Sequence, residues 1–364
     1  MPCNEYSRLK FWPDRLGVLV FFAVFFMAAS LAAETDGPPF KDPDDAIKFY
    51  TAEIIKNPEN GVAFRERGLA WAKKKDEGKA LSDFDTAVNI NPRDYSALAN
   101  RGMIWAARGF QDKAMADFTR AVWMNGGKDP EILFNRGLLW GDLGRNDKAK
   151  EDFSRAIAIR PSYGKAYLYR GRLLLEEDEI DKALEDFSLC VKHLPDDARG
   201  YFYRGLVFDR KGDFKAALSD LDKAIGLNSK QDRFYFHRGD VLAKSGDLKK
   251  ALADFDRAIA MNRDFLRAFY RRGTVWAGMG RHDKALGDYT MSLSILSLAR
   301  NLSGSMMETF LKTNDWIPET FYHRAISYEA EGLKKEALED AGRAVFFNPD
   351  SPAYKELKER LSKQ

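Results

Sequence analysis

An Arg-Gly step recurs along this chain at an almost constant interval. Successive glycines lie about 34 residues apart, at Gly68, Gly102, Gly137, Gly171, Gly205, Gly239 and Gly273. An eighth copy follows after a longer interval and has Ala325 in the glycine position. Self-similarity at such a period indicates small structural units that stack on their neighbours. The length of the chain therefore does not predict its number of domains, as it would for compact globular domains.

Residues 130–161 show what one unit contains. Small and apolar residues recur at helical steps of three and four, at Leu133, Gly137 and Trp140 and again at Ala149, Phe153 and Ala156. Gly144 lies between these two runs, where a helix commonly ends in a left-handed residue, and Pro161 closes the unit. The pattern predicts two short amphipathic helices, which are too short to be stable unless they pack against neighbouring copies.

This pattern resembles the tetratricopeptide repeat (TPR) family over residues 61–349. In nearly every copy a small residue is followed by an aromatic residue and then by Ala, a large residue and Ala at fixed spacing. The resemblance implies an all-α fold, a right-handed superhelical α-solenoid of about eight helix-turn-helix repeats. The repeats are expected to start near residues 61, 95, 130, 164, 198, 232, 266 and 318. Residues 34–60 are expected to form a linker and a half-repeat N-terminal cap, and residues 350–364 a C-terminal capping helix.

One feature departs from the usual family pattern in all eight repeats. An Arg precedes the Gly or Ala, at Arg67, Arg101, Arg136, Arg170, Arg204, Arg238, Arg272 and Arg324. An Asp follows each Arg at one constant spacing, at Asp83, Asp117, Asp152, Asp186, Asp220, Asp254, Asp288 and Asp340. The spacing predicts a repeated Arg–Asp ion pair, either within a repeat or between neighbours. A charged ladder that binds ligands is the alternative.

Large side chains fill two further positions of each repeat and are expected to be core. The first helices carry Trp71, Trp105, Trp140, Leu174, Phe208, Leu242, Trp276 and Tyr328, and the second helices carry Phe84, Phe118, Phe153, Phe187, Leu221, Phe255, Tyr289 and Ala341. Packing explains the Trp positions better than a sugar-binding platform, because every repeat has a large residue there. Cys190 replaces an Ala of the pattern and is expected to be a buried, inert thiol.

The N-terminal segment 1–33 has the composition of a secretory signal peptide. Arg8, Lys10 and Arg15 precede the uncharged run 16–33, which ends in small residues. We expect cleavage and a periplasmic or secreted mature chain. The alternative is an uncleaved segment that anchors the protein in the inner membrane.

An insertion interrupts the period at residues 298–318. The helix before it is expected to run on to Arg300, and the insertion contains apolar residues that no repeat position requires, among them Met307, Phe310 and Trp316. Two interpretations remain open, an extended helical hairpin that packs on the array and a loop that contacts a partner.

No sequence pattern points to an enzyme. The chain has no Gly-rich phosphate loop, no His-Glu-x-x-His motif and no paired-Cys metal spacing, so we predict no catalytic residues, no cofactor and no metal site. The formal net charge of +3 is too small to indicate a nucleic-acid-binding protein. Membrane contact is expected only through the N-terminal segment, if it is not cleaved.

The family resemblance implies that first helices line a concave groove that binds partners. Carried over position by position, the groove residues are Asn100, Asn135, Lys165, Tyr169, Arg172, Arg199, Tyr203, Arg233, Phe236, His237, Arg267, Tyr270 and Arg271. Cations interleaved with aromatic rings suit an extended peptide with acidic or aromatic side chains. The family's clamp for acidic C-terminal tails is missing, because Leu69, Glu131 and Asn135 stand where it needs other residues.

The sequence therefore predicts a non-catalytic scaffold or adaptor that is exported to the cell envelope and binds a protein or peptide. One alternative is a regulatory or substrate-recruiting subunit of an envelope enzyme complex. Another is a carrier of an anionic lipid or glycan.

Overall fold

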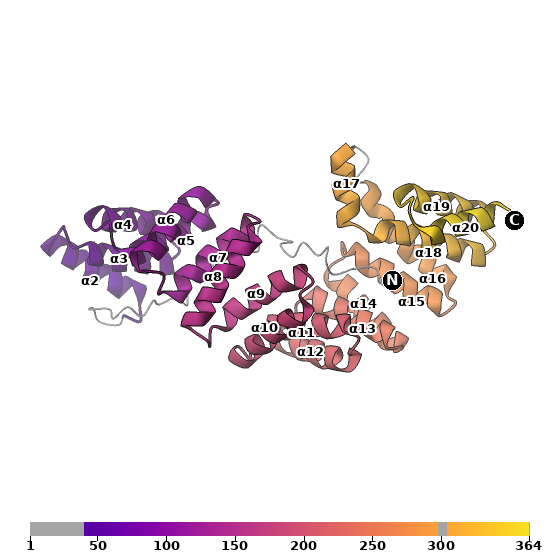
Figure 1. The fold of residues 1–364 in the computed structure, drawn as a ribbon, viewed down its shortest axis with the longest axis horizontal. Coiled ribbons are helices and arrows are strands. Elements are labelled where there is room, and N and C mark those ends of the chain that lie inside the picture. The colour runs from indigo at the N-terminus through magenta and orange to yellow at the C-terminus, as the bar shows by residue number, and fades with distance from the viewer. Residues whose placement is uncertain (1–39, 298–303, 364) are drawn as a thin grey trace. The chain divides into compact units, whose positions relative to one another are not determined.

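The structure is a computed structural model that describes residues 40–297 and 304–363 (Figure 1). Every regular element in these ranges is a helix. The described helices fall into two compact units, an N-terminal unit of residues 40–193 and a C-terminal unit of residues 194–363. The predicted signal peptide lies outside the described residues. Within the described part, no helix combines the length and apolar character needed to cross a membrane.

The N-terminal unit consists of one single helix and four helical hairpins. Its helices are α2 (Pro43–Lys56), α3 (Gly61–Lys73), α4 (Glu77–Ile90), α5 (Tyr95–Ala107), α6 (Gln111–Met124), α7 (Pro130–Asp142), α8 (Asn146–Ile159), α9 (Gly164–Glu176) and α10 (Ile180–His193). The helices α3 and α4, α5 and α6, α7 and α8, and α9 and α10 pack as hairpins. Each second helix then packs on the first helix of the next hairpin, while α2 packs on α3.

The C-terminal unit continues the same arrangement and contains the interruption. Its helices are α11 (Ala198–Arg210), α12 (Phe214–Leu227), α13 (Asp232–Lys244), α14 (Leu248–Met261), α15 (Leu266–Gly278), α16 (His282–Ser292), the 3-10 helix η1 (Leu293–Ser297), α17 (Gly304–Thr313), α18 (Trp316–Ala330), α19 (Lys334–Phe347) and α20 (Pro352–Ser362). The hairpins are α11–α12, α13–α14, α15–α16 and α18–α19, and α20 packs on α19. The predicted all-α fold of paired helices is confirmed.

Short polar residues start many of these helices, and a left-handed residue ends many first helices. The side chains of Asn60, Asp94 and Asp213 each accept a hydrogen bond from a backbone N–H in the first turn that follows. Gly144 has a φ of 70° in the turn between α7 and α8. Lys75, with a φ of 62°, takes the same turn position in the first hairpin, which glycine would occupy with less strain.

The recurring Gly is required by a close contact between the two helices of a hairpin. A Cβ added at Gly137 would lie 2.7 Å from Cε1 of Phe153, which is itself buried. The eighth repeat solves the same contact differently, because Ala325 faces Ala341 in one apolar cluster. A methyl group therefore fits on the first helix only where the aromatic ring opposite has been replaced.

All eight predicted Arg–Asp pairs form, and each lies within one hairpin. The Arg Nε–H donates to Oδ2 of its Asp and an Nη2–H donates to Oδ1, with N–O distances of 2.6–3.0 Å. Nη1–H of Arg67, Arg101, Arg170, Arg238, Arg272 and Arg324 also donates to the preceding repeat, to Thr51, Asp85, Ser154, Asp222, Asp256 and Thr290 respectively. The guanidinium thus joins the two helices of its own hairpin and reaches the hairpin before it.

The expectation that every large residue of the repeat is core is only partly correct. Those on the second helices are buried, as is Cys190, but Trp71, Trp105, Trp140 and Trp276 remain partly exposed. In each case a Lys from the second helix lies over the indole, 4.1–4.4 Å from the ring centroid. A cation–π contact therefore covers a ring that the hairpin cannot bury completely.

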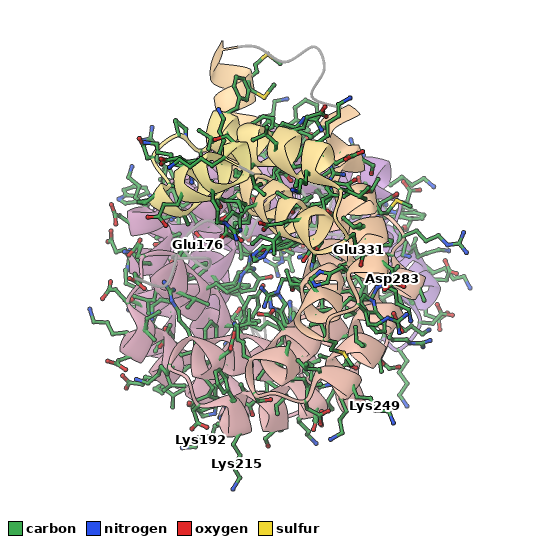
Figure 2. The ribbon with its side chains drawn as sticks, turned by 90° about the vertical axis from the view of Figure 1, so that its right-hand side faces the viewer. Glu176, Lys192, Lys215, Lys249, Asp283 and Glu331 are labelled. Carbon is green, nitrogen blue, oxygen red and sulfur yellow. The ribbon has the colours of Figure 1, made fainter. Side chains whose placement is uncertain are left out.

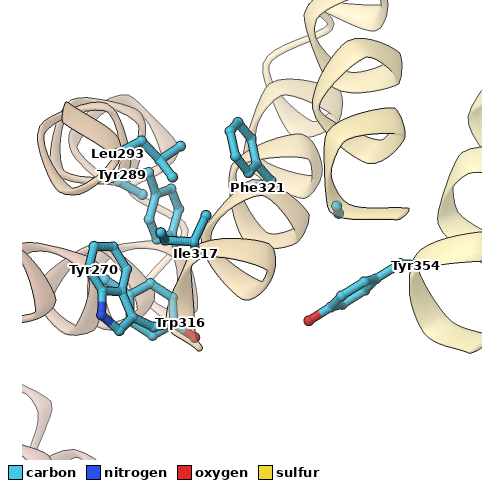
Figure 3. Close-up of a cluster of buried hydrophobic side chains, with 9 residues drawn as sticks. Tyr270, Tyr289, Leu293, Trp316, Ile317, Phe321 and Tyr354 are labelled. Atoms are coloured by element: carbon cyan, nitrogen blue, oxygen red, sulfur yellow. The ribbon is translucent and has the colours of Figure 1, made fainter. Parts of the chain in front are cut away.

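The helix before the insertion changes type before it ends. Helix α16 ends at Ser292 and the chain continues as the 3-10 helix η1 to Ser297, so the expected extension is not one uniform α-helix, and its predicted end at Arg300 lies outside the described residues. Helix α17 follows the undescribed residues 298–303, and Phe310 on it packs against the cluster in Figure 3. This cluster contains Tyr289, Trp316 and Phe321, which are buried. The packing agrees with an extended hairpin that rests on the array.

Candidate partner-binding surface

First helices of successive repeats lie beside one another in each unit. Helix α5 contacts α7 in the N-terminal unit, and α13 contacts both α11 and α15 in the C-terminal unit. Second helices carry lysines that point away from the body of the protein, such as Lys215 and Lys249 (Figure 2). The predicted partner-binding residues therefore lie on adjacent helices and can act together only within such a row.

In the N-terminal unit, two of the predicted residues are buried amides. Asn100 and Asn135 are each 5% exposed, and the Asn100 Nδ2–H donates to the carbonyl of Ser96 in its own helix at 2.8 Å. On α9, Tyr169 is also buried, and the Arg172 guanidinium lies 5.3 Å from the centroid of its ring. Lys165 lies one turn away on the same helix and is partly exposed.

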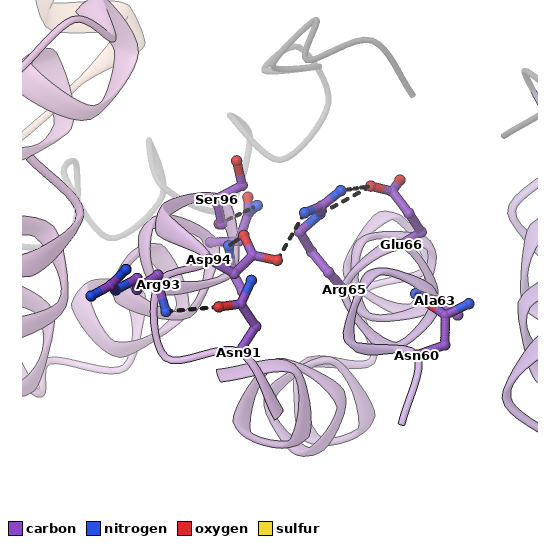
Figure 4. A network of polar contacts seen from close by, with 10 residues as sticks. Asn60, Ala63, Arg65, Glu66, Asn91, Arg93, Asp94 and Ser96 are labelled. Carbon is purple, nitrogen blue, oxygen red and sulfur yellow. Dashed lines mark hydrogen bonds and ion pairs between the residues drawn. The ribbon is translucent and has the colours of Figure 1, made fainter. Parts of the chain in front are cut away.

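Charges at the start of this unit neutralise one another (Figure 4). Arg65 on α3 donates to Glu66 at 3.0 Å and to Asp94 at 2.8 Å. Asp94 also caps α5 by accepting from the N–H of Ala97. This network joins α3 to the start of α5 and pairs one cation with two carboxylates.

In the C-terminal unit, the predicted residues of α11 and α13 surround a group of aromatic rings. Phe202 and Phe236 are buried, and the His237 ring lies between them at centroid distances of 5.4 and 5.0 Å. Tyr203 is partly exposed and contacts Phe202 edge-on at 5.2 Å. Burial lowers the pKa of His237 to about 3, and nearby Arg267, Lys244 and Arg233 also lower it, while Asp240 raises it. The imidazole is therefore neutral at pH 7.

Two carboxylates outside the predicted set neutralise the predicted Arg271 and the neighbouring Lys244. Lys244 donates to Asp209 at 2.8 Å and forms an ion pair with Asp240 at 2.9 Å, while Arg271 also pairs with Asp240. The two aspartates lie on α11 and α13, so this chain of charges joins three first helices. Burial opposes the ionisation of Asp240, but Arg271 and Lys244 outweigh it and hold its pKa below the usual range. The repeat positions could have pointed to Asp209 and Asp240, because both lie at first-helix positions that the family resemblance assigns to the groove.

The other predicted arginines differ in their surroundings. Arg199 forms an ion pair with Asp197 at 2.6 Å. Arg233 is exposed, and Arg267 lies with its guanidinium 6.0 Å from the centroid of Phe236. Among the described residues, no carboxylate forms an ion pair with Arg233 or Arg267. The buried Nε of Arg267 likewise has no hydrogen-bond partner among those residues.

Tyr270 lies inside the protein instead of on the predicted surface. It is 3% exposed, stacks on Trp316 at a centroid distance of 6.3 Å, and donates its hydroxyl to Glu319 at 2.8 Å (Figure 3). The end of the insertion brings Trp316 over this ring. The row of accessible first-helix residues is therefore interrupted at α15, which the repeat register could not show.

Nothing in the described ranges resembles a metal centre, since no group of three or more His, Cys, Asp or Glu side chains converges there. The residues of the surface instead supply ion pairs, guanidinium groups and ring faces. These groups can bind other molecules by hydrogen bonds, charge and stacking.

Comparison with known families decides what kind of array this is. Models of the tetratricopeptide repeat match residues 134–192, 198–231 and 236–294. The chain contains tetratricopeptide repeats. No curated protein matches the sequence. Repeats of this family generally act as interaction scaffolds and are not themselves catalytic.

Solved structures with a similar fold include TPR proteins of low sequence identity. In the crystal structure of the hetero-tetramer Cut9–Hcn1 of APC/C, a chain 12% identical aligns over 87% of this chain and 59% of its own length, with a TM-score of 0.55. A TPR protein from Parabacteroides merdae is 20% identical over 73% of this chain and 98% of its own, with a TM-score of 0.49. YrrB, described as a TPR protein with an unusual peptide-binding site, is 21% identical over 50% of this chain and 94% of its own, with a TM-score of 0.44.

Proposed function

We propose that this chain is a non-catalytic scaffold that binds an extended peptide or protein partner on the first helices of its C-terminal unit. The observation that carries the proposal is the pair of adjacent first helices α11 and α13, with the start of α15 next to α13. Partly exposed Tyr203, neutral His237 and exposed Arg233 lie on α11 and α13, above buried phenylalanines. A rigid base of rings with polar groups at its edge offers both the apolar area and the directional contacts that a peptide needs.

The fixed interior supports the same proposal. Arg–Asp pairs and Gly–aromatic contacts repeat with little change, whereas the residues of the first-helix surface differ from one repeat to the next. Identical interiors hold the helices in place, so the variable side chains between them are available for recognition. This division suits a scaffold whose specificity depends on its surface.

We further propose that the protein acts in the cell envelope. The support is the basic start and uncharged run of residues 1–33, which have the layout of a cleaved signal peptide. Comparison of the N-terminus of the mature protein with the gene sequence would test this. A mature chain that still begins at Met1 and sediments with membranes would support the anchored alternative.

Photo-crosslinking tests the proposed surface. A photoreactive amino acid at Tyr203 is expected to capture a discrete partner in cells, while the same amino acid at Lys215 on a second helix should not. Capture of the same partner equally well from both positions would contradict the assignment to first helices. Absence of any partner at Tyr203, with the repeats still folded, would contradict the proposed function.

A further inference from the structure

The first-helix cations of the C-terminal unit belong to two groups. Lys244 and Arg271 pair with Asp240, Lys244 pairs also with Asp209, and Arg199 pairs with Asp197. Arg233 and Arg267 form no ion pair with any carboxylate among the described residues. Both occupy the second position of their helices, α13 and α15, so they lie on adjacent helices at the same level. Carboxylates of the protein therefore neutralise the neighbouring cations, while Arg233 and Arg267 have no carboxylate partner among the described residues.

The surroundings of His237 indicate that the guanidinium groups of Arg233 and Arg267 lie near the same imidazole ring. Arg233 lies four residues before His237 on α13, so the two side chains lie on the same face of the helix, and both Arg233 and Arg267 contribute to lowering the pKa of this imidazole. The imidazole contacts Phe202 and Phe236, and Arg267 lies over the ring of Phe236. Two positive charges, exposed Arg233 and partly buried Arg267, therefore lie near a neutral ring on an apolar base, and water screens the partly buried charge less than the exposed one.

We propose that Arg233 and Arg267 together bind a carboxylate of an acidic peptide segment, whose neighbouring apolar side chain packs on Phe202 and Tyr203. This inference rests on the proposed function and names the chemistry of the partner. Guanidinium groups bind carboxylates through paired hydrogen bonds, and each arginine also carries terminal Nη–H donors besides the Nε–H, which in Arg267 is buried and unpartnered. A carboxylate placed here gains two cations without displacing an existing anion, which would not be true beside Lys244 or Arg271.

The test begins with selection from a random dodecapeptide library displayed on phage, with the full-length chain as bait. Selected peptides are expected to be enriched in Asp or Glu next to an aromatic or large aliphatic residue. A synthetic peptide from this set and its twin with Gln for Glu and Asn for Asp are then titrated by fluorescence anisotropy. The acidic peptide should bind roughly 10- to 100-fold more tightly, the range expected for charge-assisted hydrogen bonds.

Matched variants locate the effect. Arg233→Glu and Arg267→Gln are each expected to remove most of the difference between the acidic peptide and its amide twin. Lys249→Glu makes the same charge change as Arg233→Glu at an exposed position of α14 and should leave the difference intact (Figure 2). Because Arg267 is partly buried, thermal melting of its variant checks folding. Arg233 is exposed, so its variant keeps the test valid if the other variant unfolds.

The outcomes separate the inference from the proposed function. Peptides that bind but show no preference for acidic over amide twins, or an equal loss in Lys249→Glu, would overturn the carboxylate site and leave the scaffold function standing. Absence of any selected peptide would overturn both. Binding to phosphatidylglycerol vesicles that is stronger than binding to any peptide and is lost in Arg233→Glu would overturn the peptide assignment, because the anionic group would then belong to a lipid.

Discussion

Asp142 on α7 of the N-terminal unit and Asp240 on α13 of the C-terminal unit are first-helix carboxyls whose pKa values shift in opposite directions. Burial raises the pKa of Asp142 to about 6, and nearby Arg172 offsets only part of this. Asp240 is 6% exposed, yet Arg271 and Lys244 outweigh the effect of burial and lower its pKa. The pKa of a buried carboxyl therefore falls where neighbouring cations supply enough positive charge, here Lys244 from the same helix and Arg271 from the next first helix.

The interiors of the two units do not show this difference. Arg170–Asp186 in the N-terminal unit and Arg238–Asp254 in the C-terminal unit have N–O distances of 2.7–2.8 Å and the same paired geometry. Folding thus depends on positions that are alike in both units, while the residues of the first-helix surfaces differ between them. This contrast predicts large effects of changes in the shared interior and smaller effects of changes on the first-helix surface.

The largest effect is expected from breaking the repeated geometry of the interior. Asp186→Ala and Asp254→Ala should each lower the free energy of unfolding by about 3–5 kcal/mol, because each leaves a partly buried guanidinium without its main partner. The double variants Asp186→Ala with Arg170→Leu and Asp254→Ala with Arg238→Leu should recover much of that loss. Urea denaturation measures all four. Equal losses in single and double variants would show that the pairing is not what stabilises the hairpin.

A smaller loss is expected from Gly137→Ala. The added methyl group would lie 2.7 Å from the Phe153 ring, and such overpacking typically costs about 1–3 kcal/mol. Gly226→Ala on α12 is the matched control, since nothing lies within 4 Å of its added Cβ. That control should gain about 0.5–1 kcal/mol from helix propensity. If Gly137→Ala left the free energy of unfolding unchanged, the two helices of the hairpin could move apart without loss of stability.

The two carboxyls predict opposite responses to pH. Because the pKa of Asp142 is about 6 in the folded state against an ordinary 3.8, the folded state binds the proton more tightly. The contribution of protonated Asp142 to the free energy of unfolding is therefore present at low pH and is lost as pH rises from about 4 to 6. Asp142→Asn should flatten this fall in melting temperature and stabilise the protein at pH 7 by about 1 kcal/mol, after allowance for solvent screening.

Asp240→Asn is the counterpart in the C-terminal unit. Its lowered pKa means that ionised Asp240 stabilises the folded state above its ordinary pKa, so the variant should lose stability at pH 7. Melting curves from pH 4.5 to 7.5 compare the two variants with the unaltered protein. Stabilisation of both variants at pH 7 would contradict the role assigned to Arg271 and Lys244.

The smallest effect concerns the protonation of His237. Its pKa of about 3 predicts that its imidazole signals do not titrate between pH 5 and 8 in an NMR experiment, with His237→Gln used for assignment. Arg233→Gln should raise this pKa only slightly, since burial is the larger cause. Titration near pH 6.5 in the unaltered protein would show that the ring is solvated and would weaken the contrast between the units.

The sequence by itself determined the fold. The constant repeat period, the helical spacing and the Arg and Asp positions predicted the hairpins and their ion pairs, because these features involve residues within one repeat or its neighbour. The N-terminal signal and the partner-binding set as a whole stay predictions. Asp209 and Asp240 were available in the repeat register but were not connected with the cations they neutralise.

Only the tertiary structure decided which side chains of the surface remain available. It placed Tyr270 beneath Trp316, covered the tryptophans with lysines, and brought Lys244 to Asp209 on the preceding first helix. The physical reason is that burial and ionisation depend on side chains from several stacked helices at once. A repeat pattern states which positions are equivalent, but not what each neighbour contributes to the local charge.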